Sequence, residues 1–125
     1  MKEPSIIITN NPMSKERFSE AFVVEYIEGN VIEVFNRIRD YVHKGHRILT
    51  HPLMSSIKPN ETPYRTVAIS KKSEEITDIN SVILIENSIM TTNKFLNDFS
   101  TPNWSDKILL DFQLIDYDLI YHALN

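Results

Sequence analysis

The sequence predicts an α/β domain, with a small, mostly parallel four-stranded sheet flanked by helices and a helical C-terminal segment. Three observations lead to this fold class. Short apolar runs rich in β-branched residues alternate with stretches of helical spacing as far as residue 70. Two longer helical stretches then complete the chain, and no repeat or change of composition divides its 125 residues. We therefore expect residues 1–125 to form a single domain, which is an ordinary size for one hydrophobic core.

Four short segments have the composition of strands: residues 6–9, 22–26, 47–50 and 64–70. The first is the continuous apolar run Ile6-Ile7-Ile8-Thr9, which predicts a strand buried on both faces. Asn10-Asn11-Pro12 ends this strand in a turn. Because helices are expected between most of the strands, parallel pairing is favoured. The strand order and the direction of the last strand stay open.

Four helical segments are expected, at residues 14–19, 31–42, 79–99 and 105–124. Ser14 is the expected N-cap of the first. The second has Asn30 as N-cap and Gly45 just past its end, where a left-handed residue commonly stops a helix. In the last segment Asp116 suits the cap of a fresh helix, so we expect a break near residues 113–116. The aspartates of this segment are expected on a solvated face or at a cap: Asp111, Asp116 and Asp118.

Composition and charge exclude several classes of function. The net charge is −4 and Lys and Arg are scattered, which argues against nucleic acid as a partner, because phosphate contacts need clustered cations. The chain has no cysteine, so it forms no disulfide, supplies no thiolate nucleophile and binds no zinc through sulfur. With only two glycines it has no Walker loop, dinucleotide fingerprint or nucleophile elbow. We expect no cofactor.

The N-terminus lacks the apolar core of a signal peptide. No apolar stretch approaches the roughly 20 residues that a membrane span needs. We therefore expect a cytoplasmic protein with no membrane partner.

Three histidines lie within nine positions, His43, His46 and His51, and this spacing invites a metal interpretation. At about 3.3 Å per strand residue, however, His46 and His51 are too far apart for one ion, and we expect no metal site. His43 suits the C-terminus of a helix, which favours a cation. His51, at the carboxyl end of a strand, is the candidate acid–base residue. A loop histidine bonded to backbone is an equally good interpretation of His51.

Residues 51–63 form the candidate binding surface. They have no period, and three prolines favour a rigid loop. Ligands of α/β sheets bind beyond the carboxyl ends of strands, where this loop and the Asn10-Asn11 turn are expected to meet. The side chains there suit an anionic or carboxylate-bearing ligand, to which arginine offers two parallel bonds, although they could equally satisfy their own turns. The candidate ligand-binding residues are Asn10, Asn11, His51, Ser55, Ser56, Lys58, Asn60, Thr62 and Arg65.

Several strings of this sequence resemble the GrdX family. They are residues 43–53 (HKGHRILTHPL), 58–65 (KPNETPYR), 9–12 (TNNP) and 111–116 (DFQLID). The resemblance covers nearly the whole chain, and the central string is long enough to be specific. Family members tend to have a glycine after His-Pro-Leu, where this chain has Met54-Ser55-Ser56, and this departure concerns the local backbone shape.

GrdX proteins are encoded with the glycine reductase system of amino-acid-fermenting anaerobes. The resemblance implies a non-catalytic accessory or small-ligand-binding protein linked to glycine (or a related amino-acid) reductase. Its partners would be reductase components or a small anionic ligand. Without cysteine, the chain is not the redox carrier of such a pathway. One alternative is a small enzyme for a carboxylate- or phosphate-bearing metabolite, with His51 as acid or base and Lys58 or Arg65 holding the anion. Another is a homodimer that uses this segment as its contact.

Overall fold

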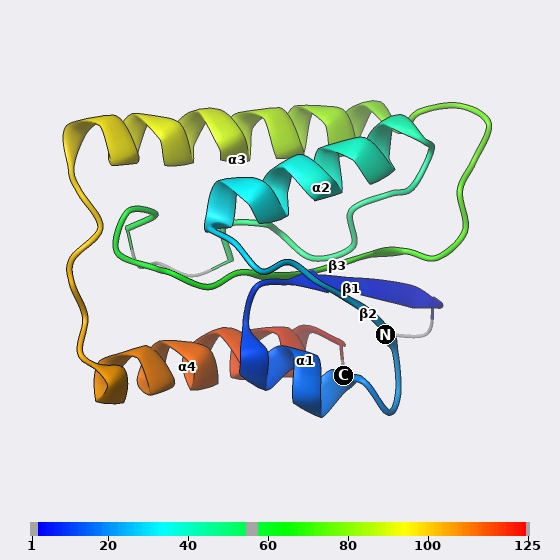
Figure 1. Cartoon of the computed structure of the whole chain (residues 1–125). Coiled ribbons are helices and arrows are strands. Elements are labelled where there is room, and N and C mark those ends of the chain that lie inside the picture. Colours follow the sequence, from blue (N-terminus) through cyan, green and yellow to red (C-terminus); the bar gives the residue numbers. More distant parts are fainter. Residues whose placement is uncertain (1–2, 55–57, 125) are drawn as a thin grey trace.

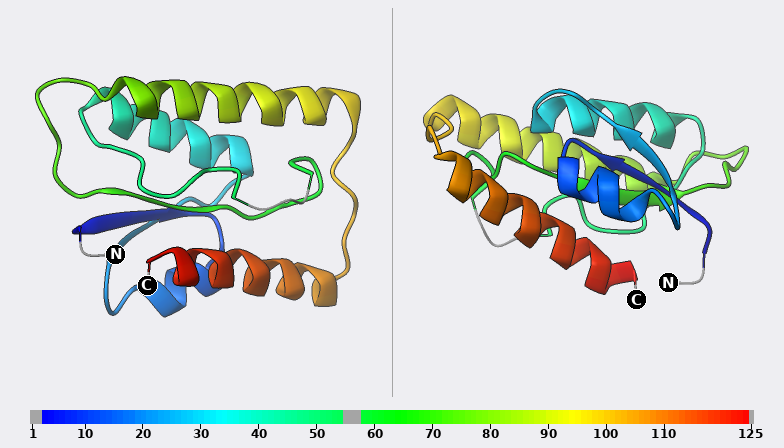
Figure 2. Two further views of the ribbon diagram at one scale, coloured as in Figure 1. Left: turned by 180° about the vertical axis from the view of Figure 1, so that it is seen from behind. Right: turned by 60° about the horizontal axis from the view of Figure 1, so that its bottom comes forward.

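The computed structural model describes residues 3–54 and 58–124, and its elements form three layers (Figure 1). The sheet is the middle layer. Helices α2 (Val31–His43) and α3 (Ile79–Asp98) cover one face, and α1 (Pro12–Phe18) and α4 (Asp106–Leu124) cover the other. The views from behind and from a tilted direction agree with this arrangement (Figure 2). The α/β class predicted from the alternation of strands and helices is confirmed.

The sheet has three described strands, β1 (Ser5–Thr9), β2 (Val23–Tyr26) and β3 (Thr66–Ser70), in the order β2-β1-β3. β1 is parallel to β2 and antiparallel to β3. The expectation of a mostly parallel four-stranded sheet is therefore wrong, because the sheet is three-stranded and mixed. Residues 47–50, which follow α2, run beside β3. No helix lies between the two segments within the described residues 51–54 and 58–65. A strand parallel to residues 47–50 would need a crossover connection, so β3 runs antiparallel to these residues.

Residues 47–50 lie along the edge of β3 but form no strand. Ile48 makes an isolated antiparallel bridge with Ile69. Two residues further, the hydroxyl of Thr50 accepts a hydrogen bond from the Ala68 N–H at 2.9 Å, where a strand would offer a backbone carbonyl. Side-chain bonds of this kind compete with the ladder, which explains why the predicted third strand does not form.

The helix ends follow local rules, with two corrections. α1 begins at Pro12 and is capped by the side chain of Asn11, which accepts a bond from its first turn. The predicted cap, Ser14, is wrong, because it lies inside this helix and is buried. Asn30 caps α2 as predicted. Gly45, also as predicted, has a left-handed φ of 104° just past α2.

α4 is continuous from Asp106 to Leu124, so the predicted break near residues 113–116 is wrong. Asp116 is neither a cap nor part of a solvated face, because it lies inside the helix and is only 8% exposed. It precedes Ile120 and Leu124 by one and two helical turns, and both of these pack on the sheet. Asp116 therefore lies on the inner face of α4.

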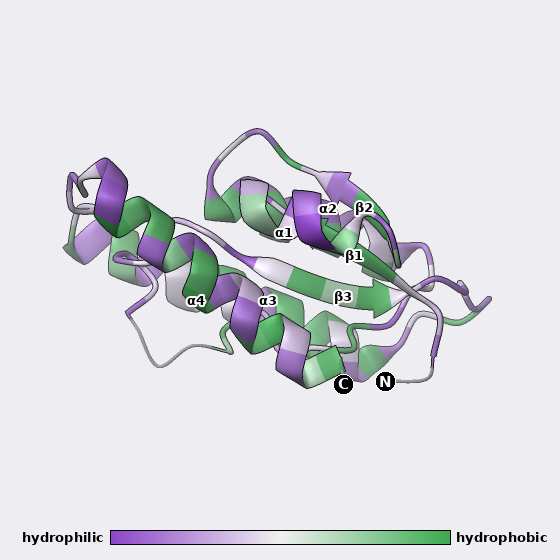
Figure 3. Ribbon diagram, turned by 90° about the horizontal axis from the view of Figure 1, so that it is seen from below, coloured by the Kyte–Doolittle hydropathy of each residue, from purple (hydrophilic) through white to green (hydrophobic). Residues whose placement is uncertain are grey.

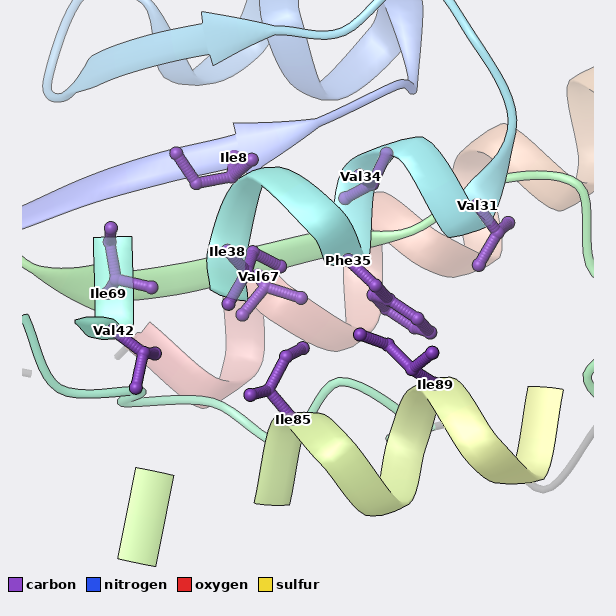
Figure 4. Packing of buried hydrophobic residues seen from close by; sticks show 10 residues of the cluster. All are labelled: Ile8, Val31, Val34, Phe35, Ile38, Val42, Val67, Ile69, Ile85 and Ile89. Carbon is purple, nitrogen blue, oxygen red and sulfur yellow. The ribbon is translucent and has the colours of Figure 1, made fainter. Parts of the chain in front are cut away.

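Each face of the sheet has its own core. On one face Ile8 and Val67 pack with Phe35 of α2 and with Ile85 and Ile89 of α3 (Figure 4). On the other face the core consists of Ile7, Ala68, Phe18, Ile120 and Leu124. Figure 3 shows α1 and α4 lying across this second face. Successive strand residues point to opposite faces, so the apolar run of β1 is buried on both sides, as predicted. Within the described chain, no helix combines the length and apolar content required to cross a membrane.

Candidate functional site

The candidate site lies at one end of the sheet, where β1 and β2 end and β3 begins. The parallel pairing of β1 with β2 and the antiparallel pairing of β1 with β3 bring these three strand ends together. The loop that leads into β3 lies at this end of the molecule, near the C-terminal half of α3 (Figures 1 and 2). Strand ends of this kind commonly hold ligands in α/β folds.

Asn10 links three segments at this end. Its Nδ2 donates to the carbonyls of Gly29 and Pro63 at 3.0 and 2.9 Å. Its Oδ1 accepts from the Arg65 N–H at 2.8 Å. The side chain is buried, so these bonds take the place of water. Asn10 therefore holds the β2–α2 connection and the loop against the beginning of β3.

Five side chains form a buried polar cluster between the sheet and helices α1 and α4; they are Thr9, Asn11, Ser14, Thr66 and Asp116. Oδ2 of Asp116 accepts from Asn11 Nδ2 at 2.9 Å and lies 2.5 Å from Thr66 Oγ1. Thr66 Oγ1 also lies 2.8 Å from the hydroxyl oxygens of Ser14 and Thr9. The cluster thus joins β1, β3, α1 and α4 through a single threonine hydroxyl.

Asp116 is a carboxyl group without an ion-pair partner, since none of the ion pairs among the described residues includes it. Burial raises its pKa above the ordinary aspartate value. The hydrogen bonds from Thr66 and Asn11 and the charge of Arg65 act in the opposite direction and lower it. Burial is the largest of these influences, so the net effect is a raised pKa.

Arg65 is only 3% exposed, and one edge of its guanidinium lacks partners. Its Nε and Nη2 have no hydrogen-bond acceptor in the described part of the chain. These two N–H groups point in parallel and can hold both oxygens of a carboxylate. Arg39 does so with the same two atoms, which donate to the two carboxylate oxygens of Glu86 at 2.7 and 2.8 Å. Arg65 therefore presents, inside the protein, an oxyanion-binding edge that no described residue occupies.

Burial lowers the pKa of Arg65, and the charge of Asp116 opposes this effect. A guanidinium nevertheless stays protonated at any ordinary pH, because its pKa in water lies far above neutrality. Arg65 is therefore a buried cation that forms no ion pair within the described chain.

Two other buried side-chain atoms without partners belong to elements that meet at this end of the sheet. They are Oδ1 of Asn60 and Oγ1 of Thr92. Nδ2 of Asn60 donates to the carbonyl of Ser100, just after α3, at 3.3 Å, and Thr92 lies in the C-terminal half of α3. α3 runs back along β3, so its C-terminal half lies over the beginning of that strand (Figure 1). Unpaired hydrogen-bonding groups therefore come from the loop, from α3 and from Arg65, the residue before β3.

A cleft of about 370 Å³ adjoins this region. Its walls include Gly29 and Pro63, whose backbone carbonyls accept hydrogen bonds from the side chain of Asn10. The full lining is Gly29, Asn30, Val31, Ile32, Pro59, Thr62, Pro63, Leu96 and Thr101. None of these side chains is charged. Arg65 follows the lining residue Pro63 by two positions and is a buried cation.

The remaining candidate residues are dispersed. His51 is exposed, and its Nδ1 accepts the Leu53 N–H at 2.9 Å, so a neutral ring carries its proton on Nε2. Lys58 is also exposed. Ser55 and Ser56 lie outside the described residues. An acid–base role for His51 stays a prediction. No group of three or more metal-ligating side chains occurs within residues 3–54 and 58–124.

The polar cluster contains residues that the sequence analysis missed as site residues: Thr9, Ser14, Thr66 and Asp116. One signal was available for Asp116. It is spaced four residues before Ile120 and eight before Leu124, so its position predicts a carboxylate on the apolar face of the helix. Thr66 offered no such signal, because threonine is common in strands.

Comparisons with known proteins give one finding. Searches of curated proteins and of solved structures gave no match. The family model described as GrdX-like protein matches residues 6–125, which include all but the first residue of the described elements. This chain belongs to the family of GrdX-like proteins.

Proposed function

We propose that this chain is a small-ligand-binding accessory protein that holds an oxyanion, above all a carboxylate, on the Nε–Nη2 edge of Arg65. The observation that carries the proposal is the lack of any partner for this buried edge. A buried charge without a counterion costs several kcal/mol. Two parallel charge-assisted bonds to an anion would offset that cost.

We propose that the uncharged part of the ligand lies in the neighbouring cleft. Pro63 forms part of its wall and precedes Arg65 by two residues, and Asn10 bonds to both. Its volume of about 370 Å³ falls within the range of about 300–1,000 Å³ that small-molecule sites occupy. The uncharged lining suits the compact, uncharged part of the ligand, and Arg65 binds its negatively charged group.

An Arg65→Met variant should lose affinity for acetate and for inorganic phosphate by at least about tenfold, or about 1.4 kcal/mol. Methionine keeps much of the aliphatic volume and removes the donors. Calorimetric titration of the folded proteins measures the effect. Without ligand, the variant should be at least as stable as the wild type, because it no longer buries an unpaired charge.

Arg39→Met is the matched control, because the same guanidinium edge is already occupied by Glu86. It should bind acetate as tightly as the wild type does. Equal affinity of the Arg65→Met and wild-type proteins for both anions would contradict the proposal, as would a wild type that binds neither.

We further propose that the protein acts alongside glycine reductase or a related amino-acid reductase. Membership of the GrdX-like family supports this setting, and the lack of cysteine assigns the electron-carrying steps to other proteins. A tagged copy expressed in an amino-acid-fermenting anaerobe should co-purify with reductase subunits, whereas an unrelated tagged protein should not. Repeated failure under native conditions would remove the partner but leave the ligand site untouched.

A further inference from the structure

We infer that Asp116 carries a proton in the ligand-free protein, and that this proton keeps the charge of Arg65 available for an incoming anion. The inference rests on the proposed function and names how the same site is regulated. It begins from the hydrogen bonds of the buried polar cluster.

Four oxygen–oxygen contacts join the hydroxyl groups of this cluster to their neighbours. Thr9 Oγ1 donates to the backbone carbonyl of Arg65 at 2.9 Å and lies 2.8 Å from Thr66 Oγ1. Thr66 Oγ1 lies 2.8 Å from Ser14 Oγ and 2.5 Å from Asp116 Oδ2. In this geometry Thr66 Oγ1 is the donor to both Ser14 Oγ and Asp116 Oδ2. A hydroxyl group carries one hydrogen and cannot donate both bonds, so one of the two contacts needs a hydrogen from its other partner.

A proton on Asp116 resolves this competition. Asp116 then donates to Thr66 Oγ1, and the hydrogen of Thr66 is free for Ser14 Oγ. Thr9 Oγ1 donates to its carbonyl partner and accepts the Asn11 N–H at 2.9 Å. An ionised Asp116 leaves either the Ser14 contact or the Asp116 contact of Thr66 without a hydrogen.

Arg65 is the charged group that acts on Asp116. The strands contribute none, since neither β1 nor β3 contains a charged residue. The charged side chains of α1 and of the neighbouring turns of α4 are exposed; they are Lys15, Glu16, Arg17, Asp111 and Asp118. The electrostatic environment of Asp116 is therefore set by burial and by Arg65.

The proton on Asp116 decides how strongly Arg65 attracts an anion. An ionised Asp116 partly neutralises the field of Arg65 and repels a second negative charge, whereas a protonated Asp116 does neither. An anion bound to Arg65 in turn raises the pKa of Asp116, so binding is accompanied by proton uptake. Anion affinity should therefore fall as the pH rises through the pKa of Asp116 in the free protein. For one coupled proton the fall is at most about tenfold per pH unit.

The first measurement needs no ligand. At about pH 6, well above the ordinary aspartate pKa, exposed carboxyl groups are ionised. The infrared difference spectrum between the wild type and Asp116→Asn should then show the carbonyl band of a neutral carboxylic acid in the wild type alone. Asparagine has the shape of a protonated aspartate and can donate to Thr66, so this variant keeps the cluster. Asp111→Asn, at an exposed position of the same helix, should leave the band in place.

The second measurement is calorimetric titration with acetate, which stays ionised above about pH 6. Buffers with different ionisation enthalpies report the protons exchanged on binding. The wild type should take up protons and should bind acetate less tightly as the pH rises. Asp116→Asn should bind acetate without that proton uptake and with an affinity that stays constant across the same pH range. Asp111→Asn should behave as the wild type does.

The outcomes separate this inference from the proposed function. If the neutral-acid band is missing but acetate binds, the inference is overturned while the ligand site stands. A band together with an acetate affinity that does not change with pH also overturns the inference. If neither acetate nor phosphate binds the wild type at any pH, the proposed function fails, and the coupling fails with it.

Discussion

Replacing Phe35 with alanine should lower the free energy of unfolding by about 3–5 kcal/mol. The ring is fully buried and packs between the sheet and α3, close to Ile89 (Figure 4). Truncation removes apolar surface from the layer that joins α2 to α3, and a rigid core closes over such a cavity only in part. Urea denaturation followed by circular dichroism measures the loss.

Phe99→Ala is the control for this variant. Phe99 follows the end of α3 and is 53% exposed, so its removal should cost less than about 1 kcal/mol. Equal losses for the two variants would show that α3 does not pack on α2 through Phe35. The comparison of the two variants thus tests the packing of the layer that contains α2 and α3, independently of any ligand.

Replacing Asn10 with alanine should cost about 2–4 kcal/mol of unfolding free energy and should also weaken acetate binding. The variant loses three side-chain hydrogen bonds, each with a net worth of about 0.5–1.5 kcal/mol. It also leaves the buried N–H of Arg65 without its side-chain acceptor. The loop and the beginning of β3 are then no longer tied together, so the position of Arg65 is less well defined. Chemical denaturation and calorimetric titration measure the two effects.

Asn93→Ala provides the matched control, because this asparagine is exposed on α3. Alanine is the better helix former, so stability should change by no more than about 0.5 kcal/mol and acetate affinity should stay the same. A loss as large as that of Asn10→Ala would mean that the bonds of Asn10 contribute nothing specific to the site.

Local signals predicted the elements whose ends are decided by neighbouring residues. Asn30 caps α2 and Gly45 follows its end because capping and a left-handed φ involve only a few adjacent backbone groups. The direction of β3 was left open, because strand pairing depends on which segments meet. The strand predicted at residues 47–50 does not form for a similar reason. The hydroxyl of Thr50 takes the place of a backbone carbonyl as the acceptor for Ala68, and this bond exists only because β3 lies beside Thr50 in the folded chain.

The candidate site likewise contains residues that the sequence predicted and residues that only the structure revealed. The sequence by itself placed a polar, proline-containing loop and the Asn10-Asn11 turn among the candidate residues, because composition alone marks such segments. It assigned Asp116 to a cap or a solvated face and gave no sign that the Nε–Nη2 edge of Arg65 is buried without a partner. Asn11 and Asp116 are separated by 105 positions, and Thr66 and Asp116 by 50. Only the tertiary structure brings them together and removes water from them, and the protonation and pairing of a charged group depend on that removal.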